Sequence, residues 1–192
     1  MKMNLAQITT QRKTGHEDFL HKGKSAPMNL LKFWQWSGSD LLNNADRGKL
    51  AEFIVASALG VSDTIRQFWD SYDLETKEGI KVEVKSSAYI QSWYQKSLSK
   101  INFDIKPTVA WNPKTNEYGS KARRQADVYV FCVLAHKEKA TINPLDLDQW
   151  DFYILPTAIL DETVGIQKMI ALSRIVKLGT VKVGYEDIEA NI

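Results

Sequence analysis

The chain is poor in several features that define other classes of protein. It has one cysteine among 192 residues, so it cannot form an internal disulfide, and a reducing compartment is expected. This residue, Cys132, lies in the apolar segment VYVFCVLA and is predicted to be buried. The longest apolar runs fall well short of the roughly 20 residues that cross a bilayer, and the N-terminus lacks the apolar centre of a secretory signal. We therefore expect a cytoplasmic protein with no membrane partner.

Charge and glycine likewise point to no particular ligand. The 25 Lys and Arg residues nearly balance the 23 Asp and Glu residues, and the formal net charge of +2 neither requires nor excludes a polyanionic partner. The sequence has no glycine-rich phosphate loop, so no nucleotide cofactor is expected. The three histidines, at positions 16, 21 and 136, lack the spacing of a metal site or a catalytic triad. The partner and the chemistry must be inferred from local patterns.

The length and the 44% hydrophobic content are those of one soluble globular domain with a substantial core. Residues 1–28 are polar and lysine-rich, and we expect them to form a loosely docked N-terminal extension. Residues 29–192 are expected to form a single domain, because neither repeats nor low-complexity tracts divide them.

The order of the hydrophobic patterns predicts an α/β protein. Helical character begins at Asn29, with Ser39 or Asp40 as the cap of a short helix. A second helix is expected from near Asp46 to Gly60, because glycine often ends a helix. The later elements are strands over 64–75, 80–90, 100–106, 126–135 and 149–156, a short helix over 157–163, and either helix or strand over 165–179. The first two strands should pair as an antiparallel hairpin within a mixed sheet flanked by helices.

A lysine follows an acid at a spacing of two residues in three places: ETK at 75–77, EVK at 83–85 and DIK at 104–106. The spacing alone therefore does not identify a site. The first copy falls in a predicted turn and the last is followed by a proline, so solvated surface side chains account for both. Only Glu83 and Lys85 lie in the middle of a strand, with Val82 and Val84 on the opposite face.

The predicted hairpin brings a second acid to Glu83. If its turn centres near Glu78, Asp73 lies directly opposite Glu83, with Cβ atoms about 4.5–5.5 Å apart. Two carboxylates at this distance repel unless a cation lies between them, and either Mg²⁺ or Lys85 would resolve the conflict. Asp70 is an alternative acid three residues earlier, but its strand parity is opposite, so Asp73 is preferred.

Glu52 supplies a third acid from a different element. In the helical segment GKLAEFIVASALG, its neighbours at three, four and seven residues are Val55, Ala56 and Leu59, so it lies on an apolar stripe. Because burying an unpaired charge is unfavourable, Glu52 must reach the surface at a helix edge or find a cation or hydrogen-bond partner. A structural ion pair and a metal site are both open at this point.

Three segments in this order, RGKLAEFIVASALG, YDLETKEGIKVEVKSSAYIQSW and RRQADVYVFCVL, resemble the PD-(D/E)XK nuclease superfamily. The resemblance implies a restriction-endonuclease-like fold, a three-layer α/β/α arrangement with a central mixed sheet. Glu52 then matches the helical glutamate of the family, and Asp73 matches the aspartate of its motif. Glu83 and Lys85 match the acid and the lysine.

The resemblance also implies a role for each residue. Asp73 and Glu83, with the Val84 carbonyl, would hold one or two Mg²⁺ ions, for which Mn²⁺ is a substitute. Glu52 would bind the metal directly or through water. Lys85 would position the attacking water and offset negative charge in the transition state.

Several polar residues near these segments are accessory candidates. Gln91 is a candidate catalytic residue, with a polar strand end as the alternative. Ser86 could donate to a phosphate or simply close the strand. Arg123 and Arg124 precede a buried strand and could grip phosphates in bidentate fashion, although a solvated pair accounts for them equally. Arg47 is a weaker phosphate candidate.

These patterns predict a Mg²⁺-dependent endonuclease that acts on DNA. Aromatic and basic residues over 93–124 could stack on bases or line a groove, although packing is the plainer explanation. Cutting both strands calls for two active sites, which makes a homodimer attractive. The alternatives are a non-catalytic DNA-binding or assembly module with the same fold, and an α/β protein whose charged residues only solvate its surface.

Overall fold

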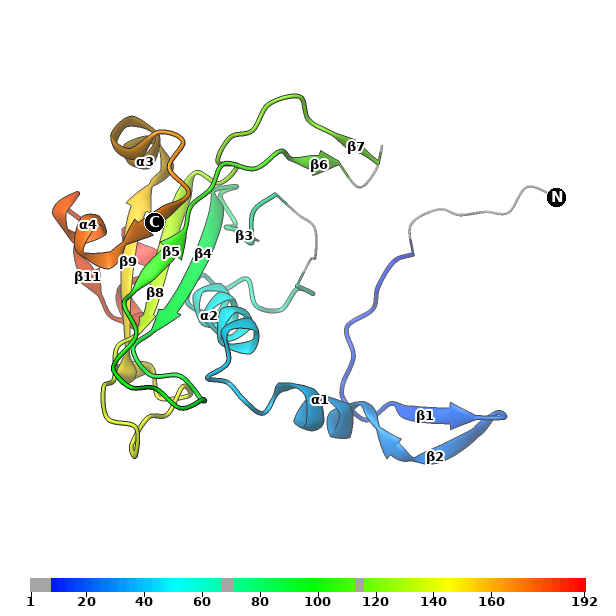
Figure 1. The fold of residues 1–192 in the computed structure, drawn as a ribbon. Coiled ribbons are helices and arrows are strands. Elements are labelled where there is room, and N and C mark those ends of the chain that lie inside the picture. Colours follow the sequence, from blue (N-terminus) through cyan, green and yellow to red (C-terminus); the bar gives the residue numbers. More distant parts are fainter. Residues whose placement is uncertain (1–7, 67–70, 113–115) are drawn as a thin grey trace.

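The structure of the chain is a computed structural model that describes residues 8–66, 71–112 and 116–192. Figure 1 shows its ribbon. In chain order, the helices and strands are β1 (Asp18–His21), β2 (Lys24–Asn29), α1 (Leu30–Gly38), α2 (Asn44–Ala58), β3 (Leu74–Glu75), β4 (Lys81–Ala88), β5 (Asn102–Asp104), β6 (Trp111–Asn112), β7 (Glu117–Tyr118), β8 (Val128–Leu134), β9 (Trp150–Pro156), α3 (Thr157–Val164), β10 (Met169–Ala171), α4 (Leu172–Lys177) and β11 (Lys182–Val183). Short 3₁₀ segments are η1 (Leu147–Gln149), η2 (Tyr185–Asp187) and η3 (Glu189–Asn191).

A five-stranded mixed sheet, in the order β11-β9-β8-β4-β3, forms the centre of the described structure (Figure 1). β4 and β8 are parallel, whereas the other neighbouring pairs are antiparallel. β8 lies in the middle and all seven of its residues are buried, which explains its continuous apolar sequence. The predicted α/β class and mixed sheet are confirmed, as is the burial of Cys132 within β8.

The sheet has a hydrophobic core on each face, because side chains alternate along its strands. On one face α2 covers β4 and β8, in a core that includes Ala51, Val55, Val82, Val84, Val130 and Cys132. On the other face lie the paired strands β5 and β10 with α3 and α4, in a core that includes Phe103, Phe131, Leu155, Leu160, Ile170 and Ile175. Glu83 and Lys85 therefore leave β4 on the face opposite α2.

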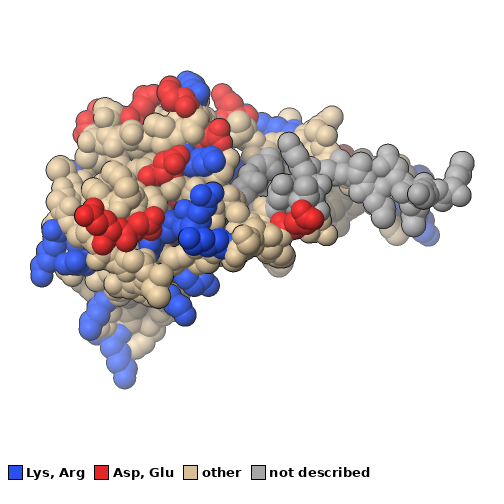
Figure 2. All heavy atoms as spheres, turned by 90° about the horizontal axis from the view of Figure 1, so that it is seen from above, with Lys and Arg blue, Asp and Glu red and all other residues tan. Residues whose placement is uncertain are grey.

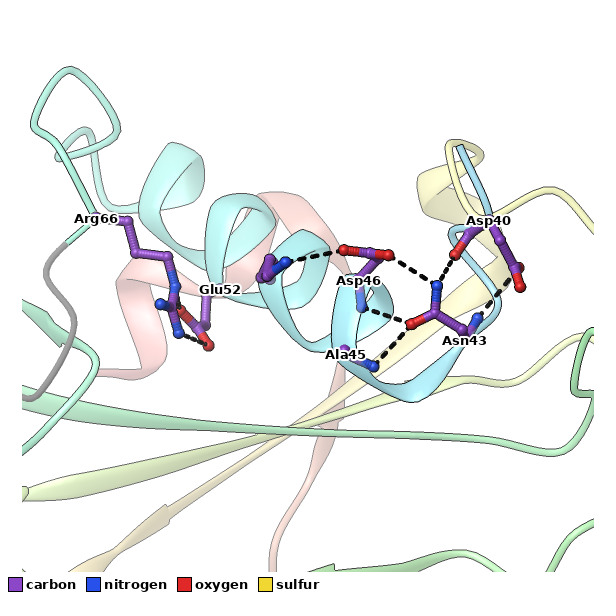
Figure 3. Close-up of polar contacts among 7 residues, drawn as sticks. Asp40, Asn43, Ala45, Asp46, Glu52 and Arg66 are labelled. Atoms are coloured by element: carbon purple, nitrogen blue, oxygen red, sulfur yellow. Dashed lines mark hydrogen bonds and ion pairs between the residues drawn. The ribbon is translucent and has the colours of Figure 1, made fainter. Parts of the chain in front are cut away.

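Both of the first two helices begin after an asparagine. Asn29 precedes α1 and Asn43 precedes α2, and each side chain accepts hydrogen bonds from amides of the first turn, as Figure 3 shows for Asn43. The predicted cap at Ser39 or Asp40 is wrong, because Asp40 instead accepts from two amides of the turn between the helices. α2 ends two residues before Gly60, whose φ of +63° suits glycine.

The N-terminal segment has more structure than the sequence predicts. β1 and β2 form an antiparallel hairpin, and β2 runs across the boundary predicted between residues 28 and 29. Lys22 and Gly23 in the turn both have positive φ, as tight hairpin turns require, but the strands DFLH and KSAPMN lack the alternation of apolar and polar residues that would reveal them. Figure 1 shows this hairpin and α1 to one side of the central sheet, and α1 buries none of its residues.

Two predicted elements differ from the structure in extent. Of the strand expected over 64–75, β3 is the part observed, and residues 67–70, which include Asp70, lie outside the described residues. The segment over 165–179 contains both a strand, β10, and a helix, α4. The other predicted strands are confirmed as β4, β5, β8 and β9, and the predicted short helix is confirmed as α3.

Candidate active site

The predicted antiparallel hairpin of β3 and β4 is present and positions Asp73 beside Glu83. The ladder pairs Leu74 with Val82, and the Asp73 amide donates to the Val82 carbonyl at 3.1 Å. The Asp73 side chain accepts a hydrogen bond at Oδ2 from the Val84 amide, at 2.8 Å. Asp73 thus contacts the residues on both sides of Glu83, which agrees with the pairing expected from the sequence.

Asp73 is a carboxyl group in an unfavourable setting. Burial raises its pKa to about 7, and the charges of Glu83 and Glu52 act in the same direction. The hydrogen bond from the Val84 amide and the charge of Lys85 oppose this rise without cancelling it. Lys85 therefore offsets the burial of Asp73 and the two neighbouring negative charges only in part.

Glu83 and Lys85 form an ion pair along one face of β4. Lys85 Nζ donates to Glu83 Oε1 at 2.5 Å, and the two side chains are 28% and 18% exposed respectively. Burial acts to lower the pKa of Lys85, but Glu83, Asp73 and Asp104 together raise it. Lys85 is therefore a protonated cation at neutral pH, and its charge interacts with more than one carboxylate.

Asp73 and Glu83 open into a cleft of about 610 Å³. The rest of its lining comes from Ser71 and from the chain that enters and forms the β6–β7 hairpin: Thr108, Val109, Ala110, Trp111, Asn116 and Tyr118. Figure 1 shows this hairpin extending from the same end of the sheet at which β3 lies. The cleft thus combines carboxylates with aromatic side chains.

Glu52 does not join the other two acids. Its carboxylate forms an ion pair with Arg66, through Nε and, at 2.8 Å, through Nη2 (Figure 3). Both residues line a separate cavity of about 90 Å³, although the charge of Glu52 still raises the pKa of Asp73. Among residues 8–66, 71–112 and 116–192, no three Asp, Glu, His or Cys side chains are grouped so that they could hold a metal ion. The structure therefore brings together two of the three predicted acids.

Arg47, Ser86 and Gln91 form a buried network on the α2 side of β4. Arg47 Nε donates to Ser86 Oγ at 3.1 Å, and Arg47 Nη1 donates to Gln91 Oε1 at 3.0 Å. The Leu42 carbonyl and Asn44 Oδ1 accept the remaining guanidinium hydrogen bonds, at 2.9 and 2.7 Å. The predictions that Arg47 and Ser86 contact phosphate and that Gln91 is catalytic are not supported, because these side chains bind one another away from the cleft.

The two arginines that precede β8, Arg123 and Arg124, lie in different surroundings. Arg124 is buried, donates to the Ile105 carbonyl at 2.9 Å and pairs with Asp161 at 2.5 Å, so it ties β5 to α3. The prediction that Arg124 grips DNA is therefore not supported. Arg123 is exposed, and its backbone pairs with that of Thr108, which lines the cleft. A phosphate contact by Arg123 stays a prediction, as does a metal contact by the Val84 carbonyl.

The surface charge is mixed, in line with the formal net charge of +2. Figure 2 shows acidic and basic side chains interspersed on the face seen from above, without a continuous basic area among its coloured residues. A polyanion would therefore depend on particular cations near the cleft, such as Arg123, and less on a broad positive field.

Sequence patterns miss two features of this region. Arg66 lies fourteen residues after Glu52 in a segment with strand-like character, and nothing in its spacing indicates an ion pair. Trp111 and Tyr118 are visible as aromatic residues, but their strands of two residues each are too short for alternation to show which way they face.

Asp73 and Glu83 fit a hard divalent cation as a pair. Both are oxygen ligands beside an open cleft, and the charge of Glu83 adds to burial in raising the pKa of Asp73. Mg²⁺ is often bound by only one or two carboxylates, with water and phosphate oxygens as its other ligands. Two acids are thus sufficient as protein ligands.

The fold and this cleft define a class: a mixed α/β protein with an acidic, lysine-containing site at one end of its sheet. The chain belongs to the bacteriophage T4 endonuclease IV family, because the model of that family matches residues 1–165. The match includes every residue of the cleft and stops before β10. A comparison with curated proteins finds no match. Membership of this family supports nuclease activity. Separately, none of the helices in the described residues is long and apolar enough to span a membrane.

Proposed function

We propose that this chain is an endonuclease that uses a divalent metal ion to hydrolyse phosphodiester bonds in DNA. Its family supports nuclease activity. The assignment of the site rests on one observation: the partly buried Asp73 lies beside Glu83 in an open cleft, where burial and the charges of Glu83 and Glu52 raise its pKa to about 7. The mixed sheet, with Asp73 directly before β3 and Glu83 on β4, supports the restriction-endonuclease-like fold that the PD-(D/E)XK resemblance implies.

Asp73 and Glu83 would hold Mg²⁺, or Mn²⁺ as its substitute, with help from the Val84 carbonyl. The bound ion would polarise the scissile phosphate and acidify a water molecule. Glu52 would take part only after leaving Arg66, or through a water molecule. This division makes Asp73 and Glu83 the primary ligands and Glu52 a conditional one.

Lys85 would act as a cation and hydrogen-bond donor. Its pKa is raised by the surrounding carboxylates, so it remains protonated and does not serve as a general base at neutral pH. A fixed ammonium group beside the reacting phosphate offsets the negative charge that develops in the transition state. Glu83 holds this ammonium group in place through the 2.5 Å contact.

Cleavage of DNA by the purified full chain tests the proposal. Plasmid and single-stranded DNA should be cut in the presence of Mg²⁺ or Mn²⁺, and Lys85→Ala should reduce the rate at least about a hundredfold. Lys77→Ala is the matched control, since Lys77 occupies the same acid-x-lysine pattern in the exposed turn of the same hairpin. Wild-type cleavage that survives Lys85→Ala would contradict the assigned role.

The alternative is a DNA-binding module that does not catalyse. The existing ion pairs of Glu83 with Lys85 and of Glu52 with Arg66 favour it, because they satisfy two of the three acids without a metal. Calorimetric titration with Mn²⁺ separates the two functions. The nuclease should bind the ion with an affinity that Asp73→Asn abolishes, whereas the module should bind DNA without binding Mn²⁺.

The homodimer expected from the sequence also remains a proposal. α1 supports it, because this helix exposes Phe33, Trp34 and Trp36 and buries none of its residues. Large exposed apolar surfaces are typical of protein interfaces. Sedimentation of the full chain should show a dimer that Trp36→Ala weakens, and a monomer at all concentrations would rule the proposal out.

A further inference from the structure

The cleft beside Asp73 and Glu83 has an aromatic part that the proposed chemistry does not use. Trp111 of β6 and Tyr118 of β7 are direct cross-strand partners, and both line the cleft. Directly opposed residues project from the same face of a hairpin, so the two rings belong to one surface. Tyr118 is 76% exposed and Trp111 is partly exposed, which means that neither ring is committed to the hydrophobic core.

Backbone hydrogen bonds anchor the β6–β7 hairpin at its base, and the cationic residue Arg123 lies at this base. Thr108 and Arg123 exchange two backbone hydrogen bonds of 3.0 Å, and the Gly119 amide donates to the Ala110 carbonyl at 2.7 Å. The exposed Arg123 side chain is oriented by a 3.0 Å hydrogen bond from its Nε to Gln125. The aromatic surface is thus held at a defined place on the sheet, with a guanidinium group beside its base.

Aromatic rings, a nearby cation and a site for phosphodiester cleavage together match a nucleobase with its phosphate. Bases stack on exposed aromatic side chains while cations hold the backbone, and this stacking tolerates any base. The cleft volume of about 610 Å³ lies within the range of sites that enclose a small organic group. We propose that the surface formed by Trp111 and Tyr118 binds one unstacked base of the DNA strand whose backbone lies at Asp73 and Glu83.

The proposal rests on the proposed function, because DNA is the polymer only if the chain is a nuclease acting on it. It adds a base contact that the carboxylates alone do not give. A base inside a duplex has both faces covered by its neighbours, so it must leave the stack before it can lie on an aromatic side chain. The contact at Trp111 and Tyr118 therefore requires that base to be unstacked.

Binding of the full chain to a short single-stranded oligonucleotide tests the inference. EDTA is added so that no metal-dependent cleavage takes place, and affinity is measured by fluorescence anisotropy. Trp111→Ala should weaken binding about tenfold, whereas Trp111→Phe, which keeps an aromatic ring, should weaken it less than about threefold. Trp93→Ala is the matched control, since Trp93 is 51% exposed and does not line the cleft.

A second readout identifies the contact as stacking. An oligonucleotide with 2-aminopurine at successive positions should show fluorescence quenching at one position in the wild-type complex, and Trp111→Ala should remove it. Equal affinity of wild type and a folded Trp111→Ala variant, or equal weakening by Trp93→Ala, would overturn the inference. Wild-type protein that binds no single-stranded DNA would also overturn it, whereas the nuclease proposal is judged separately by cleavage with Mg²⁺.

Discussion

Polar side chains lie on both faces of β4, and the two groups differ in how well their charged members are paired with hydrogen-bond or ion-pair partners. Toward α2, the guanidinium group of Arg47 donates to four uncharged acceptors, on Leu42, Asn44, Ser86 and Gln91. Toward the cleft, Asp73 and Glu83 lie beside the ammonium group of Lys85, and burial raises the pKa of Asp73 to about 7.

The difference between these groups indicates their roles. A buried guanidinium group with an acceptor at each of its three nitrogens stabilises a fold, and nothing in this network calls for a ligand. A carboxyl group with a strongly raised pKa in an open cleft costs stability, and such groups are common at functional sites. The α2 side of β4 is therefore assigned to stability and the cleft side to chemistry.

Asp73→Asn should have the largest effect, and it should act on activity. Removing the negative charge removes a proposed metal ligand, so we expect the rate of DNA cleavage to fall at least about a thousandfold. The fold should be as stable as the wild type or more so, because the unfavourable carboxylate is gone. Asp63→Asn makes the same chemical change at an exposed side chain and should leave the rate unchanged. Cleavage that persists in Asp73→Asn would remove this acid from the mechanism.

Arg47→Ala should lower stability and leave activity nearly unchanged, the reverse of what is expected for Asp73→Asn. The buried Arg47 loses one buried and three partly buried hydrogen bonds, so the free energy of unfolding in urea should fall by about 3 kcal/mol. Cleavage per folded molecule should change little. Arg12→Ala, which breaks an exposed ion pair with Asp63, should cost less than about 1 kcal/mol. A variant at Arg47 that stays stable but loses cleavage would place this residue in the site.

The pH dependence of stability should differ between wild type and Asp73→Asn. Asp73 has a pKa of about 7 in the fold and near 3.8 when unfolded, so the folded state holds the extra proton between these values. Its contribution is fully present below about pH 4 and is lost as the pH rises to about 7, a change of about 4 kcal/mol. Urea unfolding at several pH values should show this loss in wild type relative to Asp73→Asn. Parallel curves for the two proteins would contradict the assignment.

Glu52→Gln should have the smallest effect if the ion pair with Arg66 is its main role. The Arg66 side chain is 36% exposed, so losing the pair should cost less than about 1 kcal/mol of unfolding free energy. The pKa of Asp73 should move down, because one of the charges that raise it has gone. A hundredfold loss of cleavage would instead mean that Glu52 leaves Arg66 and joins the metal site.

The sequence predicts the framework of the site well because that framework is local. The valines of β4 alternate with Glu83 and Lys85, and alternation alone separates the core face from the cleft face. The turn between β3 and β4 is short, so counting residues across it is enough to place Asp73 beside Glu83. The buried strand β8 is equally plain from its unbroken apolar run.

The partners of the other polar residues depend on which elements pack together. Arg47, Gln91, Glu52 and Arg124 all suit a nuclease site in their chemistry, yet Arg47 binds Gln91, Glu52 binds Arg66, and Arg124 is buried against β5 and α3. Periodicity shows which residues share a face of one helix or strand. It does not show which face of a neighbouring element meets them, and that is decided by the packing of the whole chain.

The sequence by itself therefore determined the α/β class, the central strands and the Asp73, Glu83 and Lys85 grouping, since each follows from residues close together in the chain. Tertiary structure alone decided that Glu52 pairs with Arg66 and that Trp111 and Tyr118 face the acids across a cleft. Those contacts join segments whose separation in sequence carries no pattern, and only the energetics of packing and charge neutralisation bring them together.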